Sequence, residues 1–340
     1  MCSITHFSKA NTLVTFSALL SLVLLSLQVF AQQTPYEEPF FSIVNHKEPM
    51  QQGDNSHRAK RIEAISETLL GAKYEDGSLG EGAHGVYDTD PLIRFDVFDC
   101  TTYVEAVVAG AMSQSKATFE KNLKQLRYKN GQVEFIYRNH FPSLDWIPNN
   151  QDKLTDITHL VAPDDVQLAQ ATIDKPSWYK NMKANRLKCE SEHSLSCKQR
   201  LAQLQQEGRH FQPENSTIAY VPLSAIYLKE DKLKESKSKE GESKDVNGNS
   251  INHRILDRIP SGSVISMVRP NWNIKKWIGT NMNVSHQSIA IRKGDRLYLR
   301  HASQTHKHVI DEDFITYFSK YLDNSSLKGF NVLVLKDRQY

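Results

Sequence analysis

The sequence predicts an α+β protein, with helices concentrated in the first half of the chain and strands in the last third. Apolar residues recur at helical spacing over residues 56–72, 101–112 and 117–127. Two apolar runs between residues 284 and 301 flank a short glycine turn, which is typical of a β-hairpin. Helices and strands that are segregated along the chain in this way favour the α+β class.

The first 31 residues have the features of a secretory signal peptide. Lys9 gives a weakly positive start, an apolar run extends from Leu13 to Phe30, and Ala31 is a small residue suited to cleavage before Gln32. An uncleaved membrane anchor is the competing interpretation, because the run is nearly long enough to span a bilayer. We expect cleavage, and hence an exported, periplasmic protein without stable membrane insertion.

The composition is that of an ordinary globular protein, with 39% hydrophobic and 24% charged residues. A formal net charge of +3 is too close to neutral to suggest a nucleic-acid-binding protein. Residues 229–250 are almost entirely Lys, Glu, Ser, Asp, Gly and Asn, a composition that cannot bury enough apolar surface to fold. We therefore predict a single domain over residues 32–340, with polar insertions near 163–215 and 229–250.

The cysteines divide into a pair and a single residue. Cys189 and Cys197 lie close enough in a polar stretch to close a short loop in an oxidising compartment. Cys100 is then left alone, either as a reactive thiol or as a buried, inert side chain. It lies at or just before the start of a predicted helix, where free N–H groups and the helix dipole favour a thiolate. This position makes Cys100 a candidate nucleophile.

The other local signals complete the predicted elements. Thr102 and Glu105 have the spacing of a capping box at the start of the helix after Cys100. Short strands are predicted at residues 133–137, 263–268 and 332–335.

The hairpin near the C-terminus carries two histidines. A two-residue turn at Lys293 and Gly294 would pair His286 directly with His301, and opposed residues share a face of a sheet. A slip to an even register would separate them. A cysteine hydrolase needs a thiolate, a base and a group that orients the base, together with donors for the oxyanion. Cys100, with its own backbone N–H, and the two histidines offer such a set.

Several segments resemble the N-acetylmuramoyl-L-alanine amidase-like family, a branch of the NlpC-type, papain-like cysteine peptidases. Residues 94–105 resemble its nucleophile motif, residues 284–291 its base strand and residues 299–303 the strand of its third catalytic residue. Residues 137–140 and 145–150 resemble further segments of the site. The likeness covers most of residues 60–340, whereas the two polar insertions do not obviously match the family pattern.

The resemblance implies a papain-like core, with the helix that bears the nucleophile packed on an antiparallel sheet. It implies hydrolysis of the amide between N-acetylmuramic acid, with the anhydro form as a candidate, and L-alanine in peptidoglycan fragments (muropeptides). Cys100 would be the nucleophile, His286 the base, His301 the orienting residue and, by looser analogy, Tyr74 an oxyanion donor. The candidate substrate-binding residues are Arg138, His140, Trp146 and Asn150. No cofactor or metal is expected.

Other interpretations stay open at this point. The same chemistry could cleave between D-glutamate and diaminopimelate, or the scaffold could bind peptidoglycan without catalysis. His306 and His308 could suggest a zinc amidase, but no third ligand stands at an obvious spacing. Arg138, His140 and Trp146 are as well suited to a structural role in their loops as to binding a sugar or a carboxylate.

Overall fold

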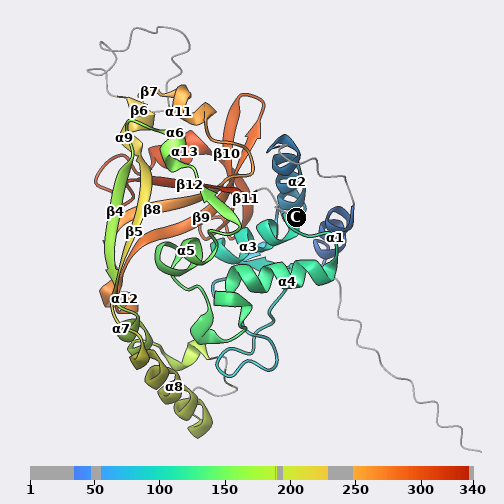
Figure 1. The fold of residues 1–340 in the computed structure, drawn as a ribbon, viewed down its shortest axis with the longest axis vertical. Helices are drawn as coiled ribbons and strands as arrows, with labels where there is room; N and C mark the ends of the chain where they lie inside the picture. Colours follow the sequence, from blue (N-terminus) through green and yellow to red (C-terminus); the bar gives the residue numbers. More distant parts are fainter. Residues whose placement is uncertain (1–33, 47–54, 188, 190–193, 229–247, 337–340) are drawn as a thin grey trace, which may run out of the picture. The chain divides into compact units, whose positions relative to one another are not determined.

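The computed structural model describes residues 34–46, 55–187, 189, 194–228 and 248–336 (Figure 1). The segment from Thr34 to Tyr340 forms one compact unit. The predicted signal peptide and most of the charged stretch at 229–250 lie outside the described residues. No helix of the described part is long and apolar enough to cross a membrane.

A largely antiparallel sheet forms the centre of the fold, in the order β2-β1-β11-β10-β9-β8-β12-β5-β4, with β3 paired to β12. Its strands are β1 (Lys73–Tyr74), β2 (Val97–Phe98), β3 (Leu154–Asp156), β4 (Gln167–Ile173), β5 (Glu214–Pro222), β8 (Val264–Asn273), β9 (Asn281–Lys293), β10 (Arg296–Ser303), β11 (His308–Asp313) and β12 (Gly329–Leu335). A separate small ladder joins β6 (Tyr227–Leu228) to β7 (Ser250–Ile251). The mixed α+β class predicted from the sequence is confirmed.

Helices cover both faces of this sheet (Figure 1). One face packs against α1 (Glu37–Asn45), α2 (Asn55–Glu67), α3 (Cys100–Ala111) and α4 (Lys116–Arg127), and the other against α6 (Thr158–Val161), α9 (Leu223–Ile226), α11 (His253–Asp257) and α13 (Phe314–Ser319). Strand β8 shows the consequence, because Val264 and Val268 belong to the first core while Ile265 and Met267 belong to the second. A strand buried on both sides reads as a continuous apolar run, which made β8 predictable.

The segment predicted as a polar insertion at 163–215 contains part of the sheet. Strand β4 pairs with β5 from Gln167 opposite Tyr220 to Ile173 opposite Glu214. The buried residues of β4 are mostly small alanines that alternate with polar residues, so the sequence lacks an obvious apolar strand pattern. Beyond these strands lie α7 (Lys175–Lys180) and α8 (Leu195–Glu207) (Figure 1).

The strand predicted at residues 133–137 is wrong. Residues Phe135–Tyr137 form a 3₁₀ turn instead, and the backbone before them turns sharply, with positive φ at Asn130 and Gly131. Phe135 packs in an aromatic cluster with Trp178 and Tyr179 rather than in a ladder. Its apolar character therefore reflects a local cluster and not a strand.

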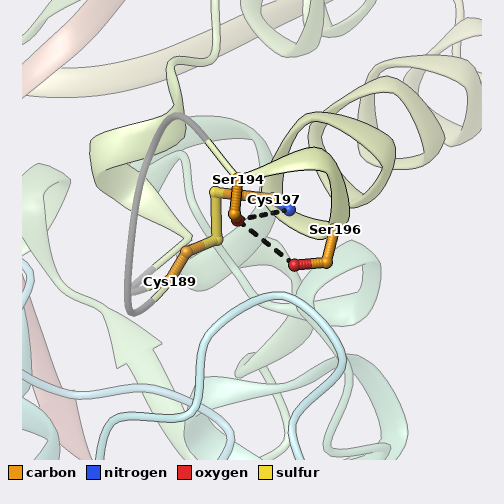
Figure 2. The surroundings of a disulfide bond; sticks show 4 residues. All are labelled: Cys189, Ser194, Ser196 and Cys197. Carbon is orange, nitrogen blue, oxygen red and sulfur yellow. Dashed lines mark hydrogen bonds between the residues drawn. A yellow bond between two sulfur atoms is a disulfide. The ribbon is translucent and has the colours of Figure 1, made fainter.

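The predicted disulfide between Cys189 and Cys197 is confirmed (Figure 2). Ser194, which lies between them, caps α8 by accepting a hydrogen bond from the backbone N–H of Cys197 at 3.2 Å. Cys100 is a free thiol. The bond thus ties the start of α8 to the segment that follows α7.

Candidate active site

Cys100 is the first residue of α3, as the sequence predicted. The helix begins with a reciprocal cap, in which Asp99 accepts from the Thr102 backbone N–H at 2.8 Å and the Thr102 hydroxyl accepts from the Asp99 N–H at 2.9 Å. The capping box is therefore Asp99 with Thr102, one turn earlier than the predicted pair of Thr102 and Glu105. With Asp99 as the N-cap, the free N–H groups of the first turn lie directly beside the cysteine.

The start of α3 is fastened to β9 next to His286. The Thr101 hydroxyl donates to the Gln287 side-chain oxygen at 3.1 Å, and the Cys100 Sγ lies 3.9 Å from Thr101 Oγ1. Burial, with the Asp99 carboxylate second, raises the pKa of the Cys100 thiol to about 12, although the backbone N–H of Gln287 opposes the shift. Burial therefore opposes the thiolate that a position at a helix start favours.

The two histidines are neighbours, but in a register that differs from the predicted one. Lys293 pairs with Arg296, so the turn falls at Gly294 and Asp295 and the direct pairing of His286 with His301 is wrong. Because the partner of each residue moves by two positions, both side chains stay on the same face as diagonal neighbours. His286 Nε2 lies 2.7 Å from His301 Nδ1.

A β-bulge lies beside His286. The ladder between β8 and β9 runs regularly to Met267 opposite His286 and then shifts its register before Val268. Bulges bend a strand and re-aim the side chains next to them. Within the described residues no hydrogen bond joins His286 to Cys100.

Glu312 extends the histidine pair, and the sequence did not predict it. Its Oε2 lies 2.9 Å from His301 Nε2 and its Oε1 accepts from Lys320 at 2.9 Å. The hydrogen bond from His301 is the main cause that lowers the pKa of Glu312 to about 2. Glu312 lies on β11, on the same face as His301, but residues 309–313 are two apolar residues followed by three acidic ones, so no alternation in the sequence indicated which carboxylate faces the histidine.

The carboxylate determines which ring nitrogens carry protons. An ionised Glu312 only accepts, so the proton in its bond to His301 lies on Nε2, and Nδ1 is left as the acceptor for His286. His286 must then donate from Nε2, which leaves its Nδ1 with a free lone pair. Burial, followed by the neighbouring His301, lowers the pKa of His286 to about 3, which favours this neutral form.

A cavity of about 700 Å³ opens beside Cys100 and includes four of the predicted site residues. These residues are Tyr74, Cys100, Arg138 and His140. Tyr74 is half-buried, its hydroxyl has no hydrogen-bond partner among the described residues, and burial followed by Cys100 raises its pKa. Its phenol is therefore a protonated donor close to the thiol.

Arg138 and His140 form part of the cavity wall. Arg138 donates to the Leu79 carbonyl at 2.8 Å and lies 3.8 Å from Glu81 and 3.9 Å from Asp88. His140 Nε2 lies 2.9 Å from the carbonyl oxygen of Phe135. Burial, with Arg138 second, lowers the pKa of His140 to about 3, so the ring is neutral.

The structure does not place Trp146 and Asn150 on the cavity. Both are 0% exposed. Trp146 donates from Nε1 to Glu105 at 3.2 Å, and Asn150 donates to the Leu126 carbonyl at 2.9 Å. Glu105 itself lines the cavity and pairs with Arg127 at 2.6 Å. The two predicted ligand-binding residues therefore support the wall from behind.

The histidines at 306 and 308 make hydrogen bonds within the protein. His306 Nδ1 lies 3.0 Å from Ser303 Oγ, and His308 Nδ1 lies 2.7 Å from the His306 carbonyl oxygen. In the part of the chain that the structure describes, no group of three or more His, Cys, Asp or Glu residues could hold a metal ion.

A sequence model of the N-acetylmuramoyl-L-alanine amidase-like family matches residues 64–323. The chain belongs to this family. It is also similar to a protein of Legionella pneumophila, with 32% identity over 88% of this chain and 95% of the other, at a TM-score of 0.74. Among curated protein sequences there is no significant match.

A second solved structure shares the fold of this chain. A structure from Bacteroides uniformis, described as an N-acetylmuramoyl-L-alanine amidase, is 22% identical over 83% of this chain and 100% of the other, with a TM-score of 0.55. At this identity the likeness establishes the fold.

Proposed function

We propose that this protein is a cysteine amidase that hydrolyses the amide between N-acetylmuramic acid and L-alanine in peptidoglycan fragments. The observation that carries the proposal is the hydrogen-bonded series His286, His301 and Glu312, beside a free Cys100 at the edge of a cavity. Membership of the amidase-like family supports the substrate class. The packing of α3 on β9 and β10 supports a papain-like core.

In the proposed mechanism, His286 Nδ1 accepts the Cys100 proton as the sulfur attacks the lactyl carbonyl carbon. The oxyanion receives hydrogen bonds from the backbone N–H of Cys100 and from the Tyr74 hydroxyl. His286 then returns the proton to the leaving nitrogen of L-alanine, and water hydrolyses the thioester with the same histidine as base. His301 orients the ring throughout.

The raised pKa of Cys100 and the lowered pKa of His286 favour a neutral thiol and imidazole in the free protein. Proton transfer then accompanies attack instead of preceding it, as in general-base catalysis. The two side chains need to meet when substrate is bound, and catalytic hydrogen bonds commonly shorten at that step. We place this activity outside the cytoplasm, after removal of residues 1–31.

The test uses residues 32–340 and the Cys100→Ala variant with N-acetylmuramoyl peptides and their anhydro forms, with products identified by mass spectrometry. Release of intact peptide by the native protein alone is the expected result. Equal products from both proteins would remove Cys100 from the mechanism. Cleavage between D-glutamate and diaminopimelate would assign the protein to the endopeptidases, and binding without turnover would identify a binding protein.

A further inference from the structure

Arg269, on β8, has a guanidinium that is held rigidly in place. It donates from Nε to Ser285 Oγ at 2.9 Å and from Nη1 to Ser326 Oγ at 2.6 Å. The guanidinium carbon lies 5.1 Å from the centroid of the Trp272 ring and 5.6 Å from that of Tyr321. Two hydroxyls and two aromatic rings therefore fix its orientation without neutralising its charge.

No carboxylate among the described residues pairs with this cation. Two fully buried arginines are paired with carboxylates, since Arg127 lies 2.6 Å from Glu105 and Arg300 lies 2.7 Å from Asp311. The Nη2 group of Arg269 has no partner in the described part of the chain. Burial lowers the pKa of Arg269, as expected where no acidic group offsets desolvation. Half-buried, it keeps donors available for an anion.

The guanidinium lies next to the histidine pair. Ser285, its hydrogen-bond acceptor, directly precedes His286. Tyr321, one of its ring contacts, packs on Tyr317, whose ring centroid is 5.7 Å from that of His301. The cavity beside Cys100 is lined by other residues. Arg269 therefore approaches the site from the side of the base.

In the proposed mechanism the leaving group must lie next to the base, His286. In amide hydrolysis the imidazolium delivers its proton to the departing nitrogen, so the chain attached to that nitrogen extends past the histidine. A peptide that begins with L-alanine and continues with D-glutamate carries a free carboxylate close to this nitrogen. The planar fork of arginine matches a carboxylate better than any other side chain does.

We propose that Arg269 is a specificity residue that binds a carboxylate of the leaving peptide, with Ser285 and Ser326 holding the guanidinium in position. This inference rests on the proposed amidase function. It assigns the acyl, sugar-bearing part of the substrate to the cavity beside Cys100 and the acidic peptide to the surface formed by Arg269, Trp272 and Tyr321.

The first experiment measures kcat/KM for N-acetylmuramoyl-L-alanyl-D-glutamate and for the same compound with its α-carboxylate converted to the amide. Arg269→Gln should lower kcat/KM for the acid about tenfold or more, and much less for the amide. Arg269→Lys keeps the charge but not the planar fork, so its kcat/KM for the acid should lie between those of the native protein and Arg269→Gln. Arg209→Gln, at an exposed arginine on another element, is the matched control and should change neither value. Equal losses for acid and amide would overturn the proposal.

The second experiment separates this inference from the proposed function. Binding of the dipeptide L-alanyl-D-glutamate to the Cys100→Ala protein is measured by calorimetry, with and without Arg269→Gln. A tenfold or greater loss of affinity is expected. If the native protein cleaves no muropeptide but this loss occurs, the amidase proposal fails and the anion site stands. If cleavage depends on Cys100 while dipeptide affinity is unchanged by Arg269→Gln, the inference fails alone.

Discussion

Replacing Glu312 with glutamine removes the negative charge at the end of the histidine series while nearly preserving the size of the side chain. The change acts on the 2.9 Å contact between Glu312 Oε2 and His301 Nε2. Glu312 is ionised at any pH used in an assay, because its pKa is held at about 2. Its side chain is 14% exposed, so solvent screens the interaction only in part.

The size of the effect follows from the hydrogen bond. A bond to a charged group contributes about 1.5 to 3 kcal/mol. In the proposed mechanism the His301–Glu312 bond strengthens when the imidazole pair gains the Cys100 proton, so this free energy is lost mainly from the transition state. At about 1.36 kcal/mol per decade, kcat should fall about tenfold to about 150-fold in Glu312→Gln.

The assay is a pH profile of kcat and kcat/KM on a muramoyl-L-alanyl peptide, with Asp295→Asn, an exposed carboxyl on the same hairpin, as the control. The Glu312 charge favours protonated His286, so the acidic limb of kcat/KM should move to lower pH in Glu312→Gln. A structural role alone would lower the melting temperature and leave the limb in place. An unchanged kcat would refute the role of Glu312 in orienting the pair.

Three further predictions concern stability. Burial raises the pKa of Glu81 to about 7, above its unfolded value of 4.5. The contribution of Glu81 to the free energy of unfolding should therefore be complete below about pH 4.5 and be lost as pH rises through 7. Glu81→Gln should remove this part of the pH dependence of the melting temperature, which amounts to a free energy on the order of 3 kcal/mol. Trp146→Phe leaves the buried Glu105 without its indole donor and should cost about 1 to 3 kcal/mol in urea unfolding. Replacing both Cys189 and Cys197 with serine should lower the free energy of unfolding by about 2 to 3 kcal/mol, and reduction of the native protein should match it.

Local signals made part of the site predictable from sequence. The position of Cys100 at the start of α3 follows from the apolar stripe after it, although the predicted capping box lay one turn too late. The disulfide follows from two nearby cysteines. The closeness of His286 and His301 survived an incorrect turn because an odd register preserves the shared face. These features depend on residues close together in the chain.

Long-range contacts account for what was missed. Glu312 reaches His301 from a third strand whose pairing the hairpin pattern did not reveal. Strand β4 was hidden because Ala169 and Ala171 fill its buried positions. Trp146 stands in a segment that resembles the family's site, yet its indole supports Glu105 from the core. An aromatic residue in a motif does not reveal from sequence whether its ring faces a ligand or the interior.

Strand β12, near the end of the chain, lies in the middle of the sheet between β8 and β5. Until it is added, β8 and β5 each present an unpaired edge, and the edge of β8 is hydrophobic on both faces. Strand β12 therefore joins the β4–β5 ladder to the meander of β8, β9, β10 and β11, through pairings between residues far apart in the sequence. The core on each face of the sheet therefore depends on the pairing of β12, and a chain in which β12 is unpaired exposes an apolar strand edge to aggregation.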